Sequence, residues 1–417
     1  MIRTGWGLAV LLAAAGAAAA GDWPQFRGPA GDGTSAEAGL PLTWGRDRNV
    51  RWKAPLPAPG NSSPVVSRGR VFLTGTSADK ERALFCFDRA TGKQLWVRTV
   101  PFAGADPTHD TNPLGSASPA ADGERVLAWF GSAGLHCYDY DGNKLWSRDL
   151  GRFEHMWGYG PSPVLYRGAV LLNCGPGRQQ FVTAVDRAAG KTLWRQDEPD
   201  VPKKDGTPRE RQYVGSWSTP VVARVGGKDQ VVVSMPRRVV GYDPDTGAVL
   251  WTCAGLGDLV YTSAALGGGY GVAMSGYSGP AVGFRVGGTG DVTARDRLWR
   301  HTAGVPQRIG TGVLLGKHLF LVNEPGSAAC LEVETGKELW KARLPGGTVW
   351  GSPVCAAGRL YVTNKQGTTL VFAPDPAKFT LLAENRLGEP SNSTPDASDG
   401  QIFLRTFTHL WCVENTK

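Results

Sequence analysis

The sequence predicts an all-β protein: an eight-bladed β-propeller of four-stranded antiparallel blades. A short phrase ending in tryptophan recurs along the chain, and a Ser-Pro or Thr-Pro pair precedes most of its copies. The phrase-closing tryptophans are 41 to 57 residues apart, a spacing typical of propeller blades with four short strands. The 417 residues include Gly 57, Pro 29 and Trp 15 but little helical periodicity, which suits strands joined by many turns.

Most copies of the phrase contain an acidic residue, a glycine turn and a Leu-Trp strand. In the first copy these are Asp88, Gly92 and Trp96. The aspartate can cap the turn and the glycine supplies positive φ, so the pattern predicts a hairpin. We expect each tryptophan to pack between neighbouring sheets. These blade-docking residues are Trp52, Trp96, Trp146, Trp194, Trp251, Trp299 and Trp340.

The Ser/Thr-Pro pair marks the start of the innermost strand of a blade, because proline is tolerated at the first residue of a strand. A glycine a few residues later turns the chain into the second strand. The pairs begin at Ser63, Ser118, Ser162, Thr219, Ser352 and Thr394.

The last two units lack the closing tryptophan. In the first of them Ala383 stands near the expected position, and the second stops after three strands, near Glu414. Its missing fourth strand is present at the other end of the chain, around Trp52. Pairing the two ends would remove the last free sheet edges and close a ring of eight blades.

Three segments are expected. Residues 1–20 resemble a signal peptide, with Arg3, an apolar run and small residues before a cut at Gly21. Residues 21–45 are an N-terminal arm outside the repeats, and residues 46–417 form one propeller domain. No later apolar run reaches the roughly 18 residues that span a bilayer. The first cysteine is Cys86, so no lipobox cysteine follows the cut. We expect a periplasmic or secreted protein.

Seven cysteines in an exported chain raise the question of disulfides. Four occupy one repeat slot that alanine or glycine fills in other copies, so they are interpreted as small buried hydrophobes. They are Cys86, Cys137, Cys330 and Cys412. Cys174, Cys253 and Cys355 have no such assignment, and one pair could bridge. No spacing of Cys and His indicates a metal site.

The net charge is +8, without long basic runs. This balance is typical of a solvated surface and does not favour nucleic acid. Anionic glycans or lipid headgroups are better candidates as partners.

The complete repeat resembles the pyrroloquinoline-quinone (PQQ) repeat. That repeat occurs in quinoprotein alcohol dehydrogenases and in the propeller lipoprotein of the Bam complex. The resemblance covers about residues 50 to 417. The opening residues Asp22 to Pro29 and the phrase from Phe130 to Leu135 are also similar to exported PQQ-like propellers of planctomycete-type bacteria.

The resemblance implies a fold and leaves the function open, because sites are grafted on folds. The dehydrogenases hold calcium with carboxylate and amide side chains and carry a vicinal Cys-Cys ring. This chain has no adjacent cysteines and is shorter, so PQQ with calcium is an alternative and no cofactor is expected. Similarity to the assembly lipoprotein implies a binding scaffold.

The loops that enter the inner strands should converge on one mouth of the central channel. Their aromatic, Asn, His and Arg side chains suit a sugar, a polyol or an extended peptide. The alternative interpretation is that these aromatic side chains only plug the channel. The candidate ligand-binding residues are His109, Asn112, His155, Trp157, Tyr159, Tyr213, Trp217, Tyr261, Arg308, Trp350 and Asn392.

Three functions follow. The first is a non-catalytic binding or assembly scaffold for a protein or glycan, expected to be a monomer. The second is a lyase or hydrolase acting on a carbohydrate at the channel mouth, with His109 and Asp110 or His155 and Tyr159 as acid-base pairs. The third is a PQQ-dependent dehydrogenase.

Overall fold

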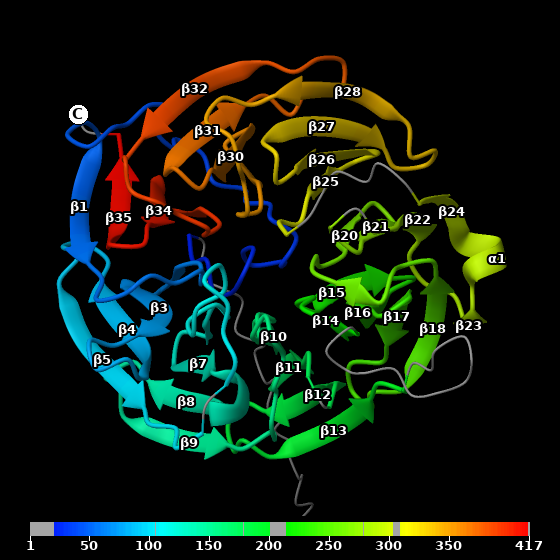
Figure 1. The fold of residues 1–417 in the computed structure, drawn as a ribbon, viewed down its shortest axis with the longest axis horizontal. Coiled ribbons are helices and arrows are strands. Elements are labelled where there is room, and N and C mark those ends of the chain that lie inside the picture. Colours follow the sequence, from blue (N-terminus) through cyan, green and yellow to red (C-terminus); the bar gives the residue numbers. More distant parts are fainter. Residues whose placement is uncertain are drawn as a thin grey trace, which may run out of the picture.

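A computed structural model of the chain describes residues 21–104, 106–177, 179–200, 214–277, 279–302 and 309–415. Within these ranges eight antiparallel sheets stand in a ring around a central axis (Figure 1). The predicted all-β, eight-bladed propeller is therefore confirmed. We number the blades 1 to 8 from the one that begins with β2.

Every blade contains four antiparallel strands, which are named here from the axis outwards. The innermost strands are β2 (Val65–Ser67), β6 (Ala120–Ala121), β10 (Val164–Tyr166), β15 (Val221–Val225), β20 (Ala265–Gly267), β25 (Val313–Leu315), β29 (Val354–Ala356) and β33 (Asp396–Ser398). The second strands are β3 (Arg70–Thr76), β7 (Arg125–Trp129), β11 (Ala169–Cys174), β16 (Lys228–Met235), β21 (Tyr270–Met274), β26 (His318–Val322), β30 (Arg359–Thr363) and β34 (Gln401–Arg405).

The third strands are β4 (Arg82–Asp88), β8 (Leu135–Asp139), β12 (Phe181–Asp186), β17 (Arg238–Tyr242), β22 (Ala281–Arg285), β27 (Ser327–Glu332), β31 (Thr368–Phe372) and β35 (His409–Glu414). The outer strands are β5 (Gln94–Val100), β9 (Lys144–Arg148), β13 (Thr192–Asp197), β18 (Val249–Ala254), β24 (Arg297–His301), β28 (Glu338–Arg343), β32 (Leu381–Arg386) and β1 (Val50–Pro55).

Four further elements lie outside this plan. The short strands β14 (Gly215–Ser216) and β19 (Leu259–Val260) pair in parallel, and β23 (Gly290–Asp291) adds a fifth strand to blade 4. The helical elements among the described residues are α1 (Thr293–Asp296) and the 3-10 turn η1 (Gly131–Ala133).

The ring closes as expected, because β1 pairs antiparallel with β35 and completes blade 8 (Figure 1). The two ends of the propeller therefore share one sheet, and no blade is left with an unpaired terminal strand.

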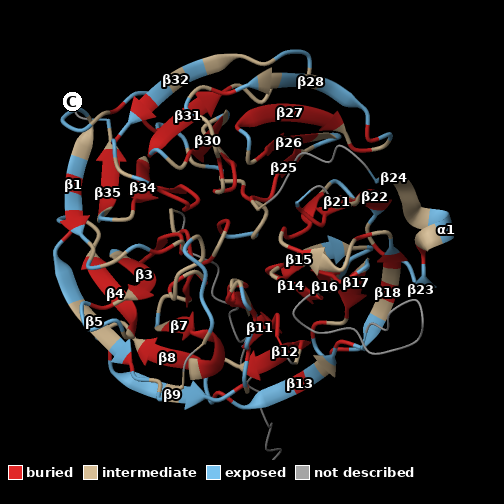
Figure 2. Ribbon diagram, viewed as in Figure 1, coloured by how far each residue is buried: buried red, intermediate tan, exposed pale blue. Residues whose placement is uncertain are grey.

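The second and third strands are buried, whereas the outer strands are largely exposed (Figure 2). In the third strand the repeat slot filled by cysteine lies directly opposite the outer-strand tryptophan, as Cys86 does opposite Trp96. The slot must be small. At Gly241 an added Cβ would lie 2.2 Å from the Trp251 ring. All seven cysteines are unbridged, so the alternative of one disulfide among Cys174, Cys253 and Cys355 is wrong.

The outer-strand tryptophans join consecutive blades. Six of the seven donate the indole N–H to a backbone carbonyl in the hairpin of the next blade, at 2.7 to 3.1 Å. The donor and acceptor residues are Trp52 and Arg89, Trp96 and Tyr140, Trp146 and Arg187, Trp194 and Pro244, Trp299 and Val333, and Trp340 and Asp375.

Trp251 differs from the other six. It is buried against Phe284 of blade 5, as expected for a blade-docking residue. Its indole N–H, however, donates to Gln230 of its own blade at 2.7 Å. The next hairpin departs from the repeat here, since β23 folds back onto β18.

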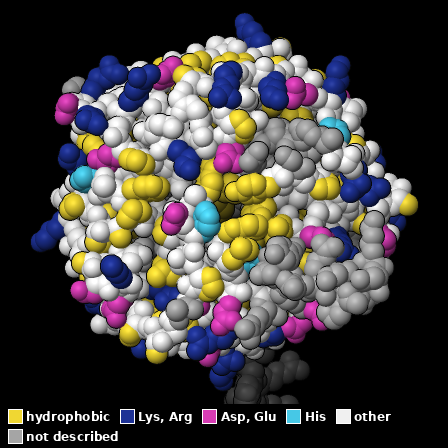
Figure 3. Space-filling model, viewed as in Figure 1, with side chains coloured by type: hydrophobic (Ala, Val, Ile, Leu, Met, Phe, Trp, Pro, Cys, Tyr) yellow, Lys and Arg dark blue, Asp and Glu magenta, His cyan; other side chains and the backbone are white. Residues whose placement is uncertain are grey.

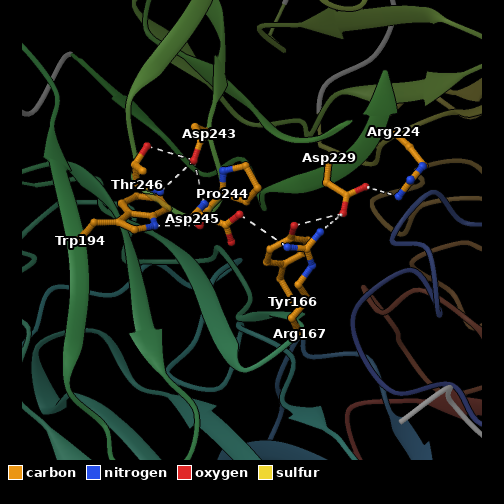
Figure 4. Close-up of polar contacts among 9 residues, drawn as sticks. All are labelled: Tyr166, Arg167, Trp194, Arg224, Asp229, Asp243, Pro244, Asp245 and Thr246. Atoms are coloured by element: carbon orange, nitrogen blue, oxygen red, sulfur yellow. Dashed lines mark hydrogen bonds and ion pairs between the residues drawn. The ribbon is translucent and has the colours of Figure 1, made fainter. Parts of the chain in front are cut away.

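Figure 4 shows the junction between blades 3 and 4. Trp194 reaches the Pro244 carbonyl, while the Asp243 carboxylate accepts hydrogen bonds from the backbone and hydroxyl of Thr246. Gly247 has a φ of +75°, and an added Cβ would lie 2.5 Å from the Trp194 ring. Glycine is therefore required for both the turn and the docking. Nearby, Asp229 accepts from Tyr166 and pairs with two arginines.

A closed ring of hydrogen bonds joins all eight blades at the axis. At the start of each innermost strand, a Ser or Thr backbone N–H donates to the hydroxyl of the equivalent residue in the next blade, at 2.8 to 3.2 Å. We call this ring the hydroxyl belt. Its members are Ser63, Ser118, Ser162, Thr219, Ser263, Thr311, Ser352 and Thr394.

Residues 21–45 run along the inner strands. Trp23 forms an antiparallel bridge with Val66 of blade 1, and Thr34 forms a parallel bridge with Cys355 of blade 7. Between them, the buried Arg27 guanidinium donates to the carbonyls of Thr311 and Gly312 at 2.7 Å. The segment thus supplies partners to backbone groups of inner strands that would otherwise be unpaired.

Trp44 occupies the junction of blades 7 and 8, where the repeat tryptophan is missing. It is buried, stacks on Tyr361 at 6.4 Å and belongs to the hydrophobic cluster against which Ala383 packs. Its backbone N–H donates to Asn385 at 2.8 Å. A residue from outside the repeats therefore fills the space that Ala383 leaves.

We predict that Thr219→Val destabilises the propeller by about 1–3 kcal/mol. The substitution removes the acceptor of the buried Ser162 N–H, and an unsatisfied buried donor has a desolvation penalty of this size. Denaturant unfolding measures the change. Thr219→Ser keeps the hydroxyl and should recover most of the loss. Equal stability of the valine variant and the parent protein would refute a structural role for the belt.

The thiols should be unreactive in the folded protein. Burial raises the pKa of every one, to about 12 for Cys86 and about 11 for Cys355, so little thiolate exists near neutral pH. A chromogenic thiol reagent at pH 8 should label the native chain slowly. It should count seven thiols after unfolding without reductant. A lower count would reveal a disulfide.

Candidate functional site

A cavity of about 510 Å³ lies on the propeller axis. Figure 3 shows hydrophobic side chains gathered beside a hollow near the centre of one face. Each blade contributes the residue two positions before its belt hydroxyl, so the repeat itself builds the wall. These residues are Asn61, Ser116, Gly160, Trp217, Tyr261, Ile309, Trp350 and Asn392.

One wall of the cavity is aromatic and comes from blades 3 to 5. Trp217 and Tyr261 stack at 4.8 Å with an angle of 17° between their planes. Tyr277 meets Tyr261 edge to face at 4.9 Å, and Trp157 lies 6.1 Å from Trp217. The Trp217 indole N–H donates to the Gly158 carbonyl at 3.0 Å. The rings hold one another in place, which favours a rigid apolar surface.

The opposite wall is polar and comes from blades 8, 1 and 2. The Asn392 amide donates to Asn61 at 3.2 Å, and the Asn61 amide donates to the Thr111 carbonyl at 2.8 Å. The His109 ring lies 2.7 Å from the Thr111 hydroxyl. Trp350 also lines the cavity, with the Lys365 ammonium 4.6 Å from its ring centre.

The connection between β5 and β6 carries His109 and Asn112 to the mouth. A buried ion pair anchors it, with Arg82 and Asp106 at 2.6 Å. Phe102 lies against the guanidinium groups of Arg82 and Arg152, at 4.6 and 4.8 Å.

Asn112 then ties this connection to the next one. Its amide donates to the carbonyls of Trp157 and Tyr159, at 2.6 and 3.0 Å. These bonds join the β5–β6 and β9–β10 connections, which together form the rim of the cavity.

The hydroxyl belt and the arm complete the lining. Every belt residue except Ser118 lines the cavity, as does Phe26 of the arm. Among the described lining residues there is no Asp, Glu, Lys or Arg, and His109 is the titratable group other than tyrosine.

The structure brings together seven of the residues proposed from the sequence. His109, Asn112, Trp157, Trp217, Tyr261, Trp350 and Asn392 all line the cavity. His155 and Tyr159 do not. His155 is buried edge to face against Trp217 at 4.8 Å, and Tyr159 is buried against Trp129 at 5.1 Å. Tyr213 and Arg308 lie outside the described residues.

Neither proposed acid-base pair is formed by hydrogen bonding. His109 bonds to Thr111 and not to Asp110. The buried Tyr159 hydroxyl has no hydrogen-bond partner in the described part of the chain, and burial raises its pKa. Both histidines support the rim through packing and short-range bonds.

Several lining residues were missed. Ser263 and Thr311 complete the belt, but Ala264 and Gly312 follow them in place of proline, so the Ser/Thr-Pro pattern does not find them. Counting one repeat length from neighbouring blades could have located both. No sequence signal places Phe26 in the cavity, because the arm is not part of the repeat.

Two structural features are absent from the described residues. No group of three or more His, Cys, Asp or Glu residues in the described ranges is arranged to hold a metal ion. Across those same residues, no helix is long and apolar enough to cross a membrane.

The fold and cavity define an eight-bladed β-propeller with an amphipathic cavity on its axis. The chain belongs to the PQQ-repeat family whose model is described as outer membrane protein assembly factor BamB. That model matches residues 43–158, 178–269 and 288–377. A search of curated proteins finds no match.

Solved structures share the fold at low identity. Quinohemoprotein alcohol dehydrogenase from Comamonas testosteroni has a TM-score of 0.69 at 12% identity, with 97% of this chain and 82% of that chain covered. BamB from Moraxella catarrhalis has a TM-score of 0.58 at 12% identity, with 87% of this chain and 99% of that chain covered. A europium-containing methanol dehydrogenase has a TM-score of 0.56 at 11% identity, with 92% of this chain and 89% of that chain covered. These likenesses concern the fold alone.

We predict that Asp106→Ala loosens the rim. It leaves the Arg82 guanidinium buried without its partner, which should lower the free energy of local opening by about 3 kcal/mol. Hydrogen exchange of residues 106–115 should accelerate, while β11 stays protected. Asp110→Ala, on the exposed part of the same connection, is the control. Unchanged exchange in the Asp106 variant would show that the ion pair does not hold the rim.

Proposed function

We propose that this protein is an exported, non-catalytic binding scaffold that holds a short glycan in its axial cavity. The observation that carries the proposal is the division of the cavity into an aromatic wall and an amide and hydroxyl wall. A sugar ring has apolar C–H faces and polar edges, so it complements both walls at once. The volume falls within the roughly 300–1,000 Å³ of small-molecule sites.

A binding role is supported over turnover by the groups at the mouth. Hydrolysis or elimination on a sugar needs a positioned acid and base, usually carboxyl groups. The described lining contains no carboxyl group; its titratable side chains are His109, which is bonded to Thr111, and the tyrosines Tyr261 and Tyr277. Burial raises the pKa of Tyr261, which disfavours it as a base. A carbohydrate lyase or hydrolase therefore finds little support in this geometry.

The lining also fits calcium-held PQQ poorly. Calcium prefers carboxylate and carbonyl oxygens, and the described lining residues include no carboxylate. No adjacent cysteines occur in the sequence to form the ring found beside the quinone in the dehydrogenases. This mismatch favours a scaffold over a quinoprotein dehydrogenase.

The resemblance to an assembly factor supports the scaffold class but concerns protein partners. A protein ligand would engage the face around the cavity and would not need to enter it. We favour the glycan because the lining is concave and amphipathic, whereas protein interfaces need broad surfaces, about 800 Å² on each partner.

The test is calorimetric titration of the protein with neutral and acidic oligosaccharides, and with PQQ plus calcium. We expect glycan binding, and Trp217→Ala should weaken it at least tenfold, because loss of a stacked ring removes about 1.4 kcal/mol or more. Trp350→Ala should act in the same direction. Tyr270→Ala, on the hairpin of blade 5 outside the cavity, is the matched control.

Each other outcome has a clear meaning. Binding of PQQ with calcium would replace the proposal by the dehydrogenase. No binding of any glycan would end the glycan proposal, and affinity capture with the protein as bait would then test a protein partner.

A further inference from the structure

We propose that the cavity selects acidic glycans, with a uronic-acid carboxylate seated at the hydroxyl belt and the sugar face on the aromatic wall. This inference rests on the proposed function and adds the charge of the ligand. Two observations support it. The belt hydroxyls have O–H groups that donate to no protein acceptor among the described residues, and two buried guanidinium groups lie behind the belt, outside the neutral cavity lining.

The belt hydroxyls keep their own hydrogens available. Each accepts one backbone N–H from the preceding blade, and in the described part of the chain none donates to a protein acceptor. A serine or threonine hydroxyl can donate one hydrogen bond while it accepts another. Accepting the N–H polarises the hydroxyl and strengthens it as a donor. The belt is therefore a ring of donors that requires acceptor atoms.

Arg405 places a positive charge behind blades 8 and 1. Its side chain is buried, and it donates to the Ser62 hydroxyl at 2.7 Å and to the Thr74 carbonyl at 2.8 Å. Asn61 and Ser63, on either side of Ser62, line the cavity. No carboxylate among the described residues lies within ion-pair distance of Arg405. Burial lowers its pKa to about 9, so it is still charged near neutral pH.

Arg27 places a second positive charge beside blades 6 and 7. It is fully buried and donates to the carbonyl of Thr311, whose side chain belongs to the belt. It also donates to the backbone carbonyl of Asp32 at 2.6 Å, and it forms no ion pair within the described ranges. Burial lowers its pKa to about 10, an effect that the Asp32 charge opposes.

Two buried cations without an ion-pair partner in the described part of the chain are unusual, since buried charges are normally paired. Screening is weak in such surroundings, so both guanidinium groups raise the potential in the cavity between them. The nearby carboxylates offset this only in part. Asp32 acts on Arg27, but its carboxylate is partly exposed and accepts hydrogen bonds from Thr34. Burial raises the pKa of Asp396, two residues after Thr394 of the belt, well above its usual value, which favours its neutral form. Asp106 is paired with Arg82, and Asp110 lies in solvent on the rim.

The donor chemistry favours a carboxylate on a sugar. Phosphate recognition usually involves guanidinium N–H groups in direct contact, but the Arg27 and Arg405 groups bond to backbone carbonyls and a serine hydroxyl. A carboxylate has two acceptor oxygens and can accept from adjacent belt hydroxyls. Its pyranose ring would lie against Trp157 and Trp217, which are the aromatic part of the proposed glycan site.

The experiment uses a chemically matched pair: an oligouronide and its carboxyl-reduced counterpart, which differ only in the charged group. Isothermal titration of the protein should show the acidic member binding at least tenfold more tightly. Arg405→Gln should reduce this preference several-fold. Arg386→Gln, which removes an exposed arginine from β32, should leave it unchanged.

The outcomes separate the two proposals. Equal or tighter binding of the reduced sugar would overturn the acidic preference and leave the glycan site intact. Binding of neither would overturn both. If Arg405→Gln fails to fold, the matched ligands on the unaltered protein decide the question.

Discussion

The hydroxyl belt is the interaction on which the rest of this structure depends. Eight inner strands meet at the axis, where they are short and their inner edges have no neighbouring strand within the blade. The belt passes one hydrogen bond from each blade to the next until the ring returns to Ser63. Because every bond joins equivalent positions, the belt holds the blades in one register. The residues two positions earlier therefore converge on the axis.

Further out, the tryptophan and glycine pairs maintain the same register. An outer-strand indole lies in the gap between two sheets and bonds to the hairpin of the next blade, where a side chain larger than glycine would collide with it. Exceptions occur where the repeat is interrupted. Trp251 bonds within its own blade because β23 alters the following hairpin, and Trp44 fills the place of a tryptophan absent at Ala383. The ring tolerates these changes because packing is retained in each case.

The repeat determines where the cavity-lining positions lie. The side chains that differ between blades determine the chemistry of the cavity. The eight equivalent positions hold six different residue types, from Gly160 to Trp350, so the walls differ although the backbone repeats. The same fold appears in alcohol dehydrogenases and in an assembly factor at about 12% identity. Function must therefore be argued from the side chains at the axis. Here these are aromatic rings, amides and hydroxyls, with buried arginines one layer behind.

The sequence by itself determined the number of blades, the closure through β1, the docking tryptophans and most of the cavity wall. These features depend on local signals that recur with the repeat: proline at a strand start, glycine at a turn, and a small residue opposite tryptophan. Tertiary structure alone decided the course of the arm and the hydrogen bonds by which Asn112 joins two connections at the cavity mouth. It also buried His155 and Tyr159 instead of exposing them. Such contacts join segments that are far apart in sequence or lie outside the repeat. Periodicity carries no information about them, and only packing in three dimensions determines which atoms meet.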